Sequence, residues 1–535
     1  MPSSSKEALQ IRELRMCYPL SDGFVLEGLN LRIKARERIA LIGSSGSGKS
    51  TVAKALLGLL PKGSNCQGEV IVSSQNLLGL TELEIQNIRG RQIGLVFQDP
   101  MTRLNPLMTS QEHLLDLLQF HFPKQSSNWL RRTSEDLLIR VGIDGSRFNS
   151  YPHELSGGMR QRLAIALAIA LKPSLVIADE PTTSLDVLFA HQVMSELASL
   201  CDEFESSLLL ITHDLALASK WCQKIAILDQ GKIVEEGPCN QVLHNPQSYV
   251  GKRLLSAAVE RERINSFTTL HSNTVLEVNN LRCWHQNSIW PWESAWIKSV
   301  DDVSFSIGAG ETLGVVGTSG CGKTTLCRAL IGLLPVRGGE VKILGKDIFK
   351  LRDIERRDAC KLLQMVFQDP LASLNPQMTI GEAIADPLLV HGLKSPSQSK
   401  PKVRELLEKV GLIPVDIFQS RFPKELSGGQ QQRVAIARAL ALNPKILICD
   451  ESLSMLDPES QIEVLALLRS LQNELGLAIL FITHDLTLAS GFCHKLIVLK
   501  NGRIVDAGDS RRIFKEPKSN LTKQLIQTRP KLELI

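Results

Sequence analysis

Two hydrophobic patterns succeed each other along this chain, and each of them occurs twice. From Leu29 to Lys34, and again from Val303 to Ile307, apolar and polar residues alternate one by one. A period of two predicts strands with one face in a core and the other in water, which is typical of antiparallel sheets. Both halves of the chain are therefore expected to begin with a half-exposed antiparallel sheet.

Uninterrupted apolar runs follow in each half. Ile39–Ile42 and Leu313–Val316 are the first of them, and each leads directly into a glycine-rich segment. Short apolar runs that alternate with helical segments indicate a buried, mostly parallel sheet covered by helices, in which ligands bind at the carboxyl ends of the strands. Further runs that end at a polar residue are Leu175–Ala178, Leu208–Ile211, Ile446–Cys449 and Ile479–Ile482.

The chain is an internal repeat of about 270 residues. GSSGSGKS at Gly43–Ser50 returns as GTSGCGKT at Gly317–Thr324, and the motifs VFQDP, LSGG, Asp-Glu and ITHD follow each loop in the same order. This register predicts a duplicated nucleotide-binding domain with two ATP sites. We expect a first domain over residues 8–257, a linker over 258–274 and a second domain over 275–535.

Composition narrows the class of protein. The 535 residues exceed one core, and 22% charged and 43% hydrophobic residues describe a globular protein. A net charge of +5 argues against a dedicated nucleic-acid binder. Eleven scattered cysteines without a C-x-x-C pair suggest reduced thiols rather than a disulfide frame or zinc site. With no signal peptide and no apolar run of spanning length, no direct membrane insertion is expected.

Both glycine loops fit the spacing G-x-x-x-x-G-K-[ST], in which backbone N–H groups surround a phosphate chain. The lysine would neutralise the outer phosphates, and the hydroxyl after it would ligate Mg²⁺. The residues expected to contact ATP are Gly43, Ser44, Ser45, Gly46, Ser47, Gly48, Lys49, Ser50 and Thr51 in the first loop, and Gly317, Thr318, Ser319, Gly320, Cys321, Gly322, Lys323, Thr324 and Thr325 in the second.

Polar residues at the ends of apolar strands complete each predicted site. Asp179 and Asp450 would stay charged there by holding Mg²⁺, together with Ser50 and Thr324. The next residues, Glu180 and Glu451, are candidate general bases for the attacking water. The remaining candidates are Gln98 and Gln368, which could reach both Mg²⁺ and the water, and His213 and His484, which could hydrogen-bond the γ-phosphate.

LSGGMRQR (Leu155–Arg162) and LSGGQQQR (Leu426–Arg433) lead into long helices. Taken alone, these segments predict only N-capped helices. In combination with the loops and strand-end residues they resemble the nucleotide-binding domains of ABC transporters over essentially the whole chain. The resemblance covers Walker A, the glutamine loop, the signature, Walker B with its glutamate, the D-loops (Leu185-Asp186 and Leu456-Asp457) and the switch histidine.

This resemblance implies tandem P-loop NTPase domains of the ABC type, each with a mostly parallel α/β core, an antiparallel β subdomain and a helical subdomain. In the family, two domains pack head to tail, so each ATP site is composite. Site one would join the first loop with Ser427, Gly428 and Gly429, and site two would join the second loop with Ser156, Gly157 and Gly158. Closure on ATP and opening after hydrolysis would drive the partner membrane subunits.

The family also stacks adenine on an aromatic residue before the loop. Tyr18 lies 25 residues before Gly43, and Trp284 lies 33 residues before Gly317, which allows for an insertion near HQNSIWPWESAW. Tyr18 and Trp284 are therefore the expected stacking residues. Trp290, Trp292 or Trp296 could replace Trp284, and packing is the alternative for all of them.

Segments after each glutamine, DPMTRLNPLMT and DPLASLNPQMT, resemble the oligopeptide, dipeptide and nickel importer ATPases. That resemblance implies two transmembrane permease subunits, an extracytoplasmic solute-binding protein and a peripheral place at the cytoplasmic face of a bacterial inner membrane. Peptide is the leading solute, with nickel, glutathione or another small solute open. Because no cysteine follows Cys493, no iron–sulfur cluster is expected.

Two departures and two alternatives remain. The second half has DESLSMLD where the family has proline and a small residue in place of Ser452 and Met455. We still expect two working sites and leave their relative rates open. A soluble twin-cassette translation factor acting on ribosomes is the alternative of another class, disfavoured by the short linker and by DEPTTSLD. A sugar importer with fused cassettes is the other.

Overall fold

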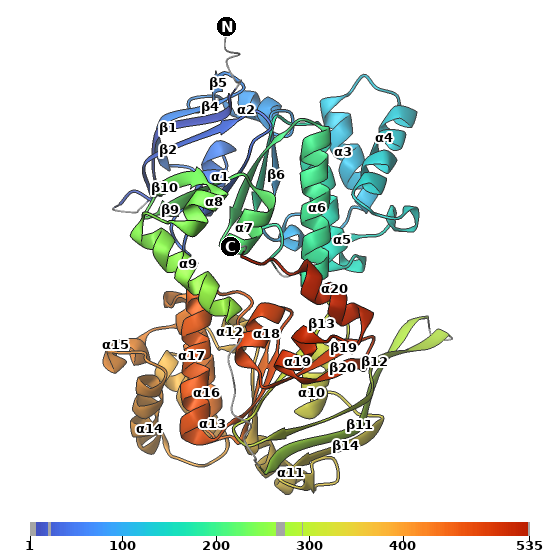
Figure 1. Ribbon diagram of the computed structural model, residues 1–535, viewed down its shortest axis with the longest axis vertical. Helices are drawn as coiled ribbons and strands as arrows, with labels where there is room; N and C mark the ends of the chain where they lie inside the picture. The colour runs from blue at the N-terminus through green and yellow to red at the C-terminus, as the bar shows by residue number, and fades with distance from the viewer. Residues whose placement is uncertain (1–6, 20–22, 184, 264–272, 291–292, 533–535) are drawn as a thin grey trace. The chain divides into compact units, whose positions relative to one another are not determined.

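Each of two units contains a four-stranded antiparallel sheet and a six-stranded, mostly parallel sheet (Figure 1). The computed structural model describes residues 7–19, 23–183, 185–263, 273–290 and 293–532. The first unit extends to Val259 for the most part, and the second covers mainly Glu260–Arg529. The predicted α/β fold, with antiparallel, parallel and helical parts in each unit, is confirmed.

In the first unit the strand orders are β2-β1-β4-β5 and β10-β9-β3-β8-β7-β6. Within the larger sheet only the β9–β10 pair is antiparallel among the pairs described. The strands are β1 (Glu7–Cys17), β2 (Leu26–Lys34), β3 (Arg38–Ile42), β4 (Asn65–Val72), β5 (Gln75–Asn76), β6 (Ile93–Val96), β7 (Leu175–Asp179), β8 (Ser207–Thr212), β9 (Lys224–Asp229) and β10 (Lys232–Pro238).

The second unit repeats this topology, with the orders β12-β11-β14-β15 and β16-β17-β18-β13-β19-β20. Its strands are β11 (Thr274–Trp290), β12 (Glu293–Gly308), β13 (Thr312–Gly317), β14 (Gly338–Ile343), β15 (Lys346–Asp347), β16 (Leu363–Val366), β17 (Ile446–Asp450), β18 (Ala478–Ile482), β19 (Lys495–Lys500) and β20 (Arg503–Asp509).

Helices cover the sheets of both units. Those of the first are α1 (Lys49–Leu56), α2 (Glu82–Ile88), α3 (Ser110–His121), α4 (Ser127–Arg140), α5 (Gly157–Ile169), α6 (Val187–Glu203), α7 (Leu215–Trp221) and α8 (Cys239–His244). The helix α9 (Tyr249–Glu262) belongs to the first unit up to Val259, and its last turn, from Glu260, belongs to the second. Those of the second are α10 (Lys323–Leu330), α11 (Asp353–Leu362), α12 (Pro370–Ser373), α13 (Ile380–Val390), α14 (Pro396–Lys409), α15 (Val415–Ser420), α16 (Gly428–Leu440), α17 (Pro458–Leu475), α18 (Leu486–Phe492), α19 (Ser510–Lys515) and α20 (Asn520–Thr528).

Burial on both faces explains the unbroken apolar runs of the parallel strands. On β3, Ile39 and Leu41 join the core between the two sheets, whereas Ala40 and Ile42 join the core under the helices. A strand with a core on each side has no polar face, so the alternation seen in β2 is lost. Among the described residues, no helix is both long and apolar enough to cross a bilayer.

Two features differ from the simplest expectation. The insertion of the second unit lengthens the β11–β12 hairpin, whose last described pair is Trp290 with Glu293. Trp292 lies outside the described residues. The segment predicted to be a linker begins in a helix, because α9 continues through Glu262, and only residues 264–272 of it are undescribed.

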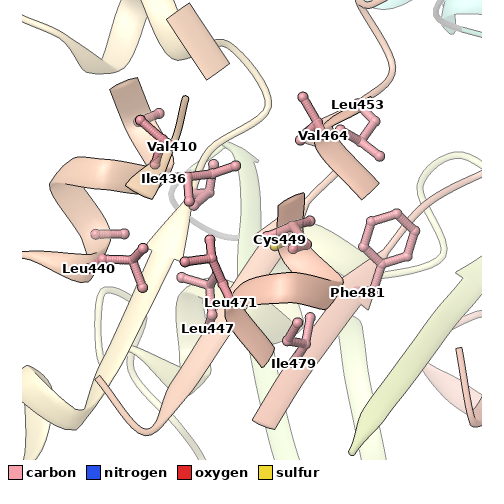
Figure 2. Packing of buried hydrophobic residues seen from close by; sticks show 14 of the residues in the cluster. Val410, Ile436, Leu440, Leu447, Cys449, Leu453, Val464, Leu471, Ile479 and Phe481 are labelled. Atoms are coloured by element: carbon pink, nitrogen blue, oxygen red, sulfur yellow. The ribbon is translucent and has the colours of Figure 1, made fainter. Parts of the chain in front are cut away.

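All eleven cysteines are free thiols, and eight of them are buried. Cys449 illustrates the environment, since it lies in the core of the second unit among Leu447, Leu471 and Phe481 (Figure 2). Burial raises the pKa of the Cys449 and Cys201 thiols to about 12. Only a small share of such thiols is therefore ionised near neutral pH.

We expect thiol reagents to separate two classes of cysteine. At pH 8 about one in 10⁴ Cys449 thiols is the nucleophilic thiolate, so labelling of the folded chain should stop at the three half-buried thiols, Cys17, Cys66 and Cys360. Denaturant should release all eleven. Mass spectrometry of the alkylated peptides measures this, and rapid labelling of Cys449 without denaturant would contradict the buried core.

Candidate active site

Both glycine loops lie between a parallel strand and a helix, β3 to α1 and β13 to α10. Lys49 Nζ donates to the carbonyl oxygens of Gly43 and Ser44 at 2.7 and 2.8 Å. Lys323 repeats this geometry with Gly317 and Thr318. The two ammonium groups are thus held inside the curve of each loop, where a phosphate chain would run.

The residue before each lysine must be glycine. Gly48 and Gly322 start their helices with φ of 107° and 109°, in the left-handed region. A Cβ on Gly322 would also lie 1.9 Å from the carbonyl oxygen of Ser299. A cavity of about 190 Å³ opens beside this loop, lined by residues of the loop, Ser299 and Glu451.

The strand-end acids meet the loops as predicted, and their environments suit a cation. Asp179 and Asp450 each receive a hydrogen bond, from Ser50 and Thr324 respectively, yet their buried Oδ1 atoms have no partner among the described residues. Burial raises the pKa of both carboxyls, that of Asp450 to about 6. A buried carboxylate oxygen without a donor beside a hydroxyl fits a Mg²⁺ ion held partly through water.

The glutamates that follow are each surrounded by donors. Glu180 accepts hydrogen bonds from Gln98 Nε2 at 3.2 Å, Thr183 Oγ1 at 3.0 Å and His213 Nδ1 at 3.0 Å. Burial raises the pKa of the Glu180 carboxyl, but the bonds from His213 and Thr183 outweigh it, so the pKa lies below its usual value. The carboxylate is therefore ionised and can accept a proton.

Glu451 has a related but different set of partners. Gln368 donates to it at 3.2 Å, His484 Nδ1 lies at 3.5 Å and Lys323 Nζ at 3.8 Å. Ser454, in the place of Thr183, donates to the backbone oxygen of Glu451 instead of the carboxylate. Burial raises the pKa of Glu451, and His484 and Lys323 more than offset it. The Glu451 carboxylate thus lacks the hydroxyl donor that Glu180 has, and it lies near the loop lysine.

Both glutamates have a left-handed backbone, with φ of 46° for Glu180 and 45° for Glu451. Non-glycine residues in this region are strained by about 1–3 kcal/mol, and such strain is concentrated at functional sites. The turn directs each side chain from the strand end toward the glutamine and histidine. This backbone geometry is the same in both units.

The signature segments start helices, as their sequence predicts. The Ser156 and Ser427 hydroxyls accept from the N–H groups of Met159 and Gln430 at the first turns of α5 and α16. Within a single unit these loops are N-caps. Their pairing with the glycine loops of the other half stays a prediction.

The structure treats the two predicted adenine-stacking residues, Tyr18 and Trp284, differently. The Tyr18 hydroxyl lies 3.1 Å from Thr51 Oγ1, so this ring reaches the glycine loop. On the hairpins, Met16 pairs with Leu26 and Cys283 pairs with Val300, and both pairs are buried. Met16 and Cys283 therefore occupy corresponding places.

With a period of two, the residue that corresponds to Tyr18 is His285. Trp284 lies on the opposite strand face, where Lys298 Nζ is 4.9 Å from its ring centroid. Of the other tryptophans, Trp296 is 41% exposed beneath the Arg337 guanidinium. This register does not support Trp284 as the stacking residue. Alternation from Leu281 through Cys283 could have indicated His285.

The family model described as "ABC transporter" matches residues 26–183 and 300–454. The peptidoglycan transport ATP-binding protein YejF of Agrobacterium fabrum is 37% identical over 542 residues, covering 100% of this chain and 98% of the relative. The glutathione import ATP-binding protein GsiA is 35% identical in Salmonella paratyphi A (94% and 86% covered) and in Escherichia coli K12 (95% and 87%). The chain belongs to the ABC transporter family, as an ATP-binding and ATP-hydrolysing protein with two ABC domains.

Proposed function

We propose that this chain is the ATP-hydrolysing subunit of a bacterial importer for peptides or a similar small solute. The observation that carries the proposal is similarity along nearly the whole chain to proteins named for peptidoglycan transport and glutathione import. Glutathione is a small peptide and peptidoglycan carries peptides, and neither name denotes a translation factor. The chain would act peripherally at the cytoplasmic face of the inner membrane.

The residue roles follow from the contacts within each unit. Lys49 and Lys323 neutralise the outer phosphates, and Glu180 and Glu451 orient and deprotonate the attacking water. Because His213 and His484 face these glutamates through Nδ1, their Nε2 atoms remain for the γ-phosphate. Asp179 with Ser50, and Asp450 with Thr324, would hold Mg²⁺ beside Gln98 and Gln368. When bound, this ion supplies positive charge to the phosphates.

Adenine recognition is proposed to differ between the two sites. Tyr18 offers a phenol ring next to the first loop, and His285 is the residue that corresponds to Tyr18 in the strand register of the second unit. An imidazole stacks on a purine as a phenol does, with a smaller face.

A groove in the second unit suits the permease contact. It has a volume of about 720 Å³ and lies among α13, α14 and the segment Asn375–Thr379. Its lining mixes the apolar Leu389 and Val403 with the two acidic residues Glu382 and Asp386 and one basic residue, Lys400. We assign it to a short cytoplasmic helix of a permease with an apolar face and a basic end.

A short stretch of chain connects the groove to the glutamine and glutamate of the second ATP site. Seven residues before the groove residue Asn375, Gln368 donates its hydrogen bond to Glu451. A helix that moves in the groove would pull on this segment and so change the position of Gln368. Transport and hydrolysis would be coupled through that movement.

Purification from native membranes tests this function. A tagged Glu180→Gln/Glu451→Gln chain, gently solubilised with ATP, should bring down two polytopic membrane proteins, whose partner solute-binding protein identifies the cargo. Leu389→Arg should abolish their recovery because it fills the groove, while Leu393→Arg, which is more exposed (49% against 40%) and is not among the lining residues, should not. Ribosomes without membrane proteins would contradict the importer proposal.

A further inference from the structure

In the second unit, the residue after the switch histidine forms an ion pair with an arginine. Among the described residues, the corresponding residue of the first unit has no such pair. Asp485, next to His484, accepts from the N–H groups of Thr487 and Leu488 and thereby caps α18. Its second oxygen accepts from Arg261 Nη2 at 2.6 Å. Arg261 lies in the last turn of α9, just before the undescribed stretch 264–272.

The pair is well shielded from water. The Arg261 side chain is 13% exposed and that of Asp485 is 23% exposed. Burial raises the pKa of the Asp485 carboxyl, and the charge of Arg261, with a contribution from His484, more than offsets this and lowers the pKa. Removal of one member of such a pair leaves the other charge poorly compensated, so the pair links the last turn of α9 to the start of α18.

The backbone of residues 261–263 also packs closely against α18. A Cβ on Gly491 would lie 3.0 Å from the carbonyl oxygen of Arg263 and 3.5 Å from that of Arg261. Arg469 on α17 donates to the carbonyl oxygen of Gly491 from the other side. The last turn of α9 therefore lies against α17 and α18 (Figure 1).

The first unit provides the comparison within the same chain. Asp214 caps α7 through the N–H groups of Ala216 and Leu217, as Asp485 does for α18. No cation pairs with Asp214 in the part of the chain that the structure describes, and Lys220 stands where the second unit has Gly491. Among the described residues, an arginine paired with the capping aspartate is thus a feature of the second unit alone.

We propose that Arg261 is a positioning residue for site two, holding the strand-to-helix turn that carries His484 through Asp485 and α18. The proposal rests on the two-site ATPase proposed above. Arg261, in the last turn of α9, thereby supports the second site and not the first.

The test reads the two sites separately in the intact chain. A protease site is placed within 264–272, the protein is trapped with orthovanadate and photoreactive radiolabelled 8-azido-ATP, and the chain is cut after photolysis. With Arg261→Ala we expect labelling of the C-terminal fragment to fall about tenfold, because a small displacement of a reacting group causes a loss of this size. Labelling of the N-terminal fragment should change less than about twofold.

Two variants serve as controls. Arg261→Lys keeps the charge and should restore a large part of the labelling. Arg263→Ala removes an exposed arginine two residues further on and should leave both fragments labelled as in the parent. Equal labelling of both fragments in parent and Arg261→Ala, or an equal loss in both, overturns the inference. A parent that labels only one fragment would instead overturn the two-site proposal.

Discussion

Glu180→Gln together with Glu451→Gln is expected to lower ATP turnover by about 10²–10⁴-fold, the usual contribution of a general base. Glutamine has the shape of glutamate, so the loops and the bound nucleotide should be undisturbed. The side chain can no longer accept a proton from water, although it still contacts Gln98 or Gln368. ATP should therefore remain bound and uncleaved.

Phosphate release and retained nucleotide after gel filtration measure the two parts of this result. Glu355→Gln, on the exposed surface of α11, is the matched control and should hydrolyse ATP normally. The single variants add information, because Glu180 has a hydroxyl donor, Thr183, that Glu451 lacks. If the double variant hydrolyses ATP at close to the parent's rate, neither glutamate is the general base.

Lys49→Met and Lys323→Met form the second strong prediction. Each lysine is at most 8% exposed and is held by two carbonyl oxygens of its loop. Methionine has similar volume but no charge, so the phosphates lose their nearest cation. We expect each variant to lose about 10²–10³-fold in turnover, as when one preorganised charge-stabilising donor is removed, and to bind ATP more weakly.

Controls for this experiment lie on the same helices. Lys54→Met on α1 and Arg328→Met on α10 remove exposed positive charges near the helix ends and should have small effects. Steady-state hydrolysis and nucleotide titration give both quantities. Near-normal hydrolysis by both lysine variants would refute the two-site assignment.

The phosphate loops, the strand-end acids and the fold could be predicted because their signals are local. Asp450 directly follows an apolar run, and the run and the acid together indicate a buried strand end. The residue corresponding to Tyr18 was not predictable by counting back from Gly317, since the insertion changes that distance. The alternation from Leu281 through Cys283 points to His285, and the strand register, with Cys283 opposite Val300, agrees with it.

Contacts between segments far apart in the sequence could not be predicted, for a different reason. Arg261 and Asp485 are separated by 224 residues, and neither belongs to a motif that anticipates the other. The groove beside Leu389 likewise depends on how α13 and α14 pack. Amphipathic patterns predict that helices bury a face, but they do not say where a hollow remains between two of them.

The left-handed glutamates have a consequence for how stability and activity are balanced in this chain. Glycine or asparagine adopts φ near 45° at less cost, so selection for stability alone would favour those residues at 180 and 451. Glutamate stands at both places, which marks them as positions where function outweighs folding stability. A search for thermostable variants that replaces non-glycine residues of positive φ would therefore include two residues that must not be replaced.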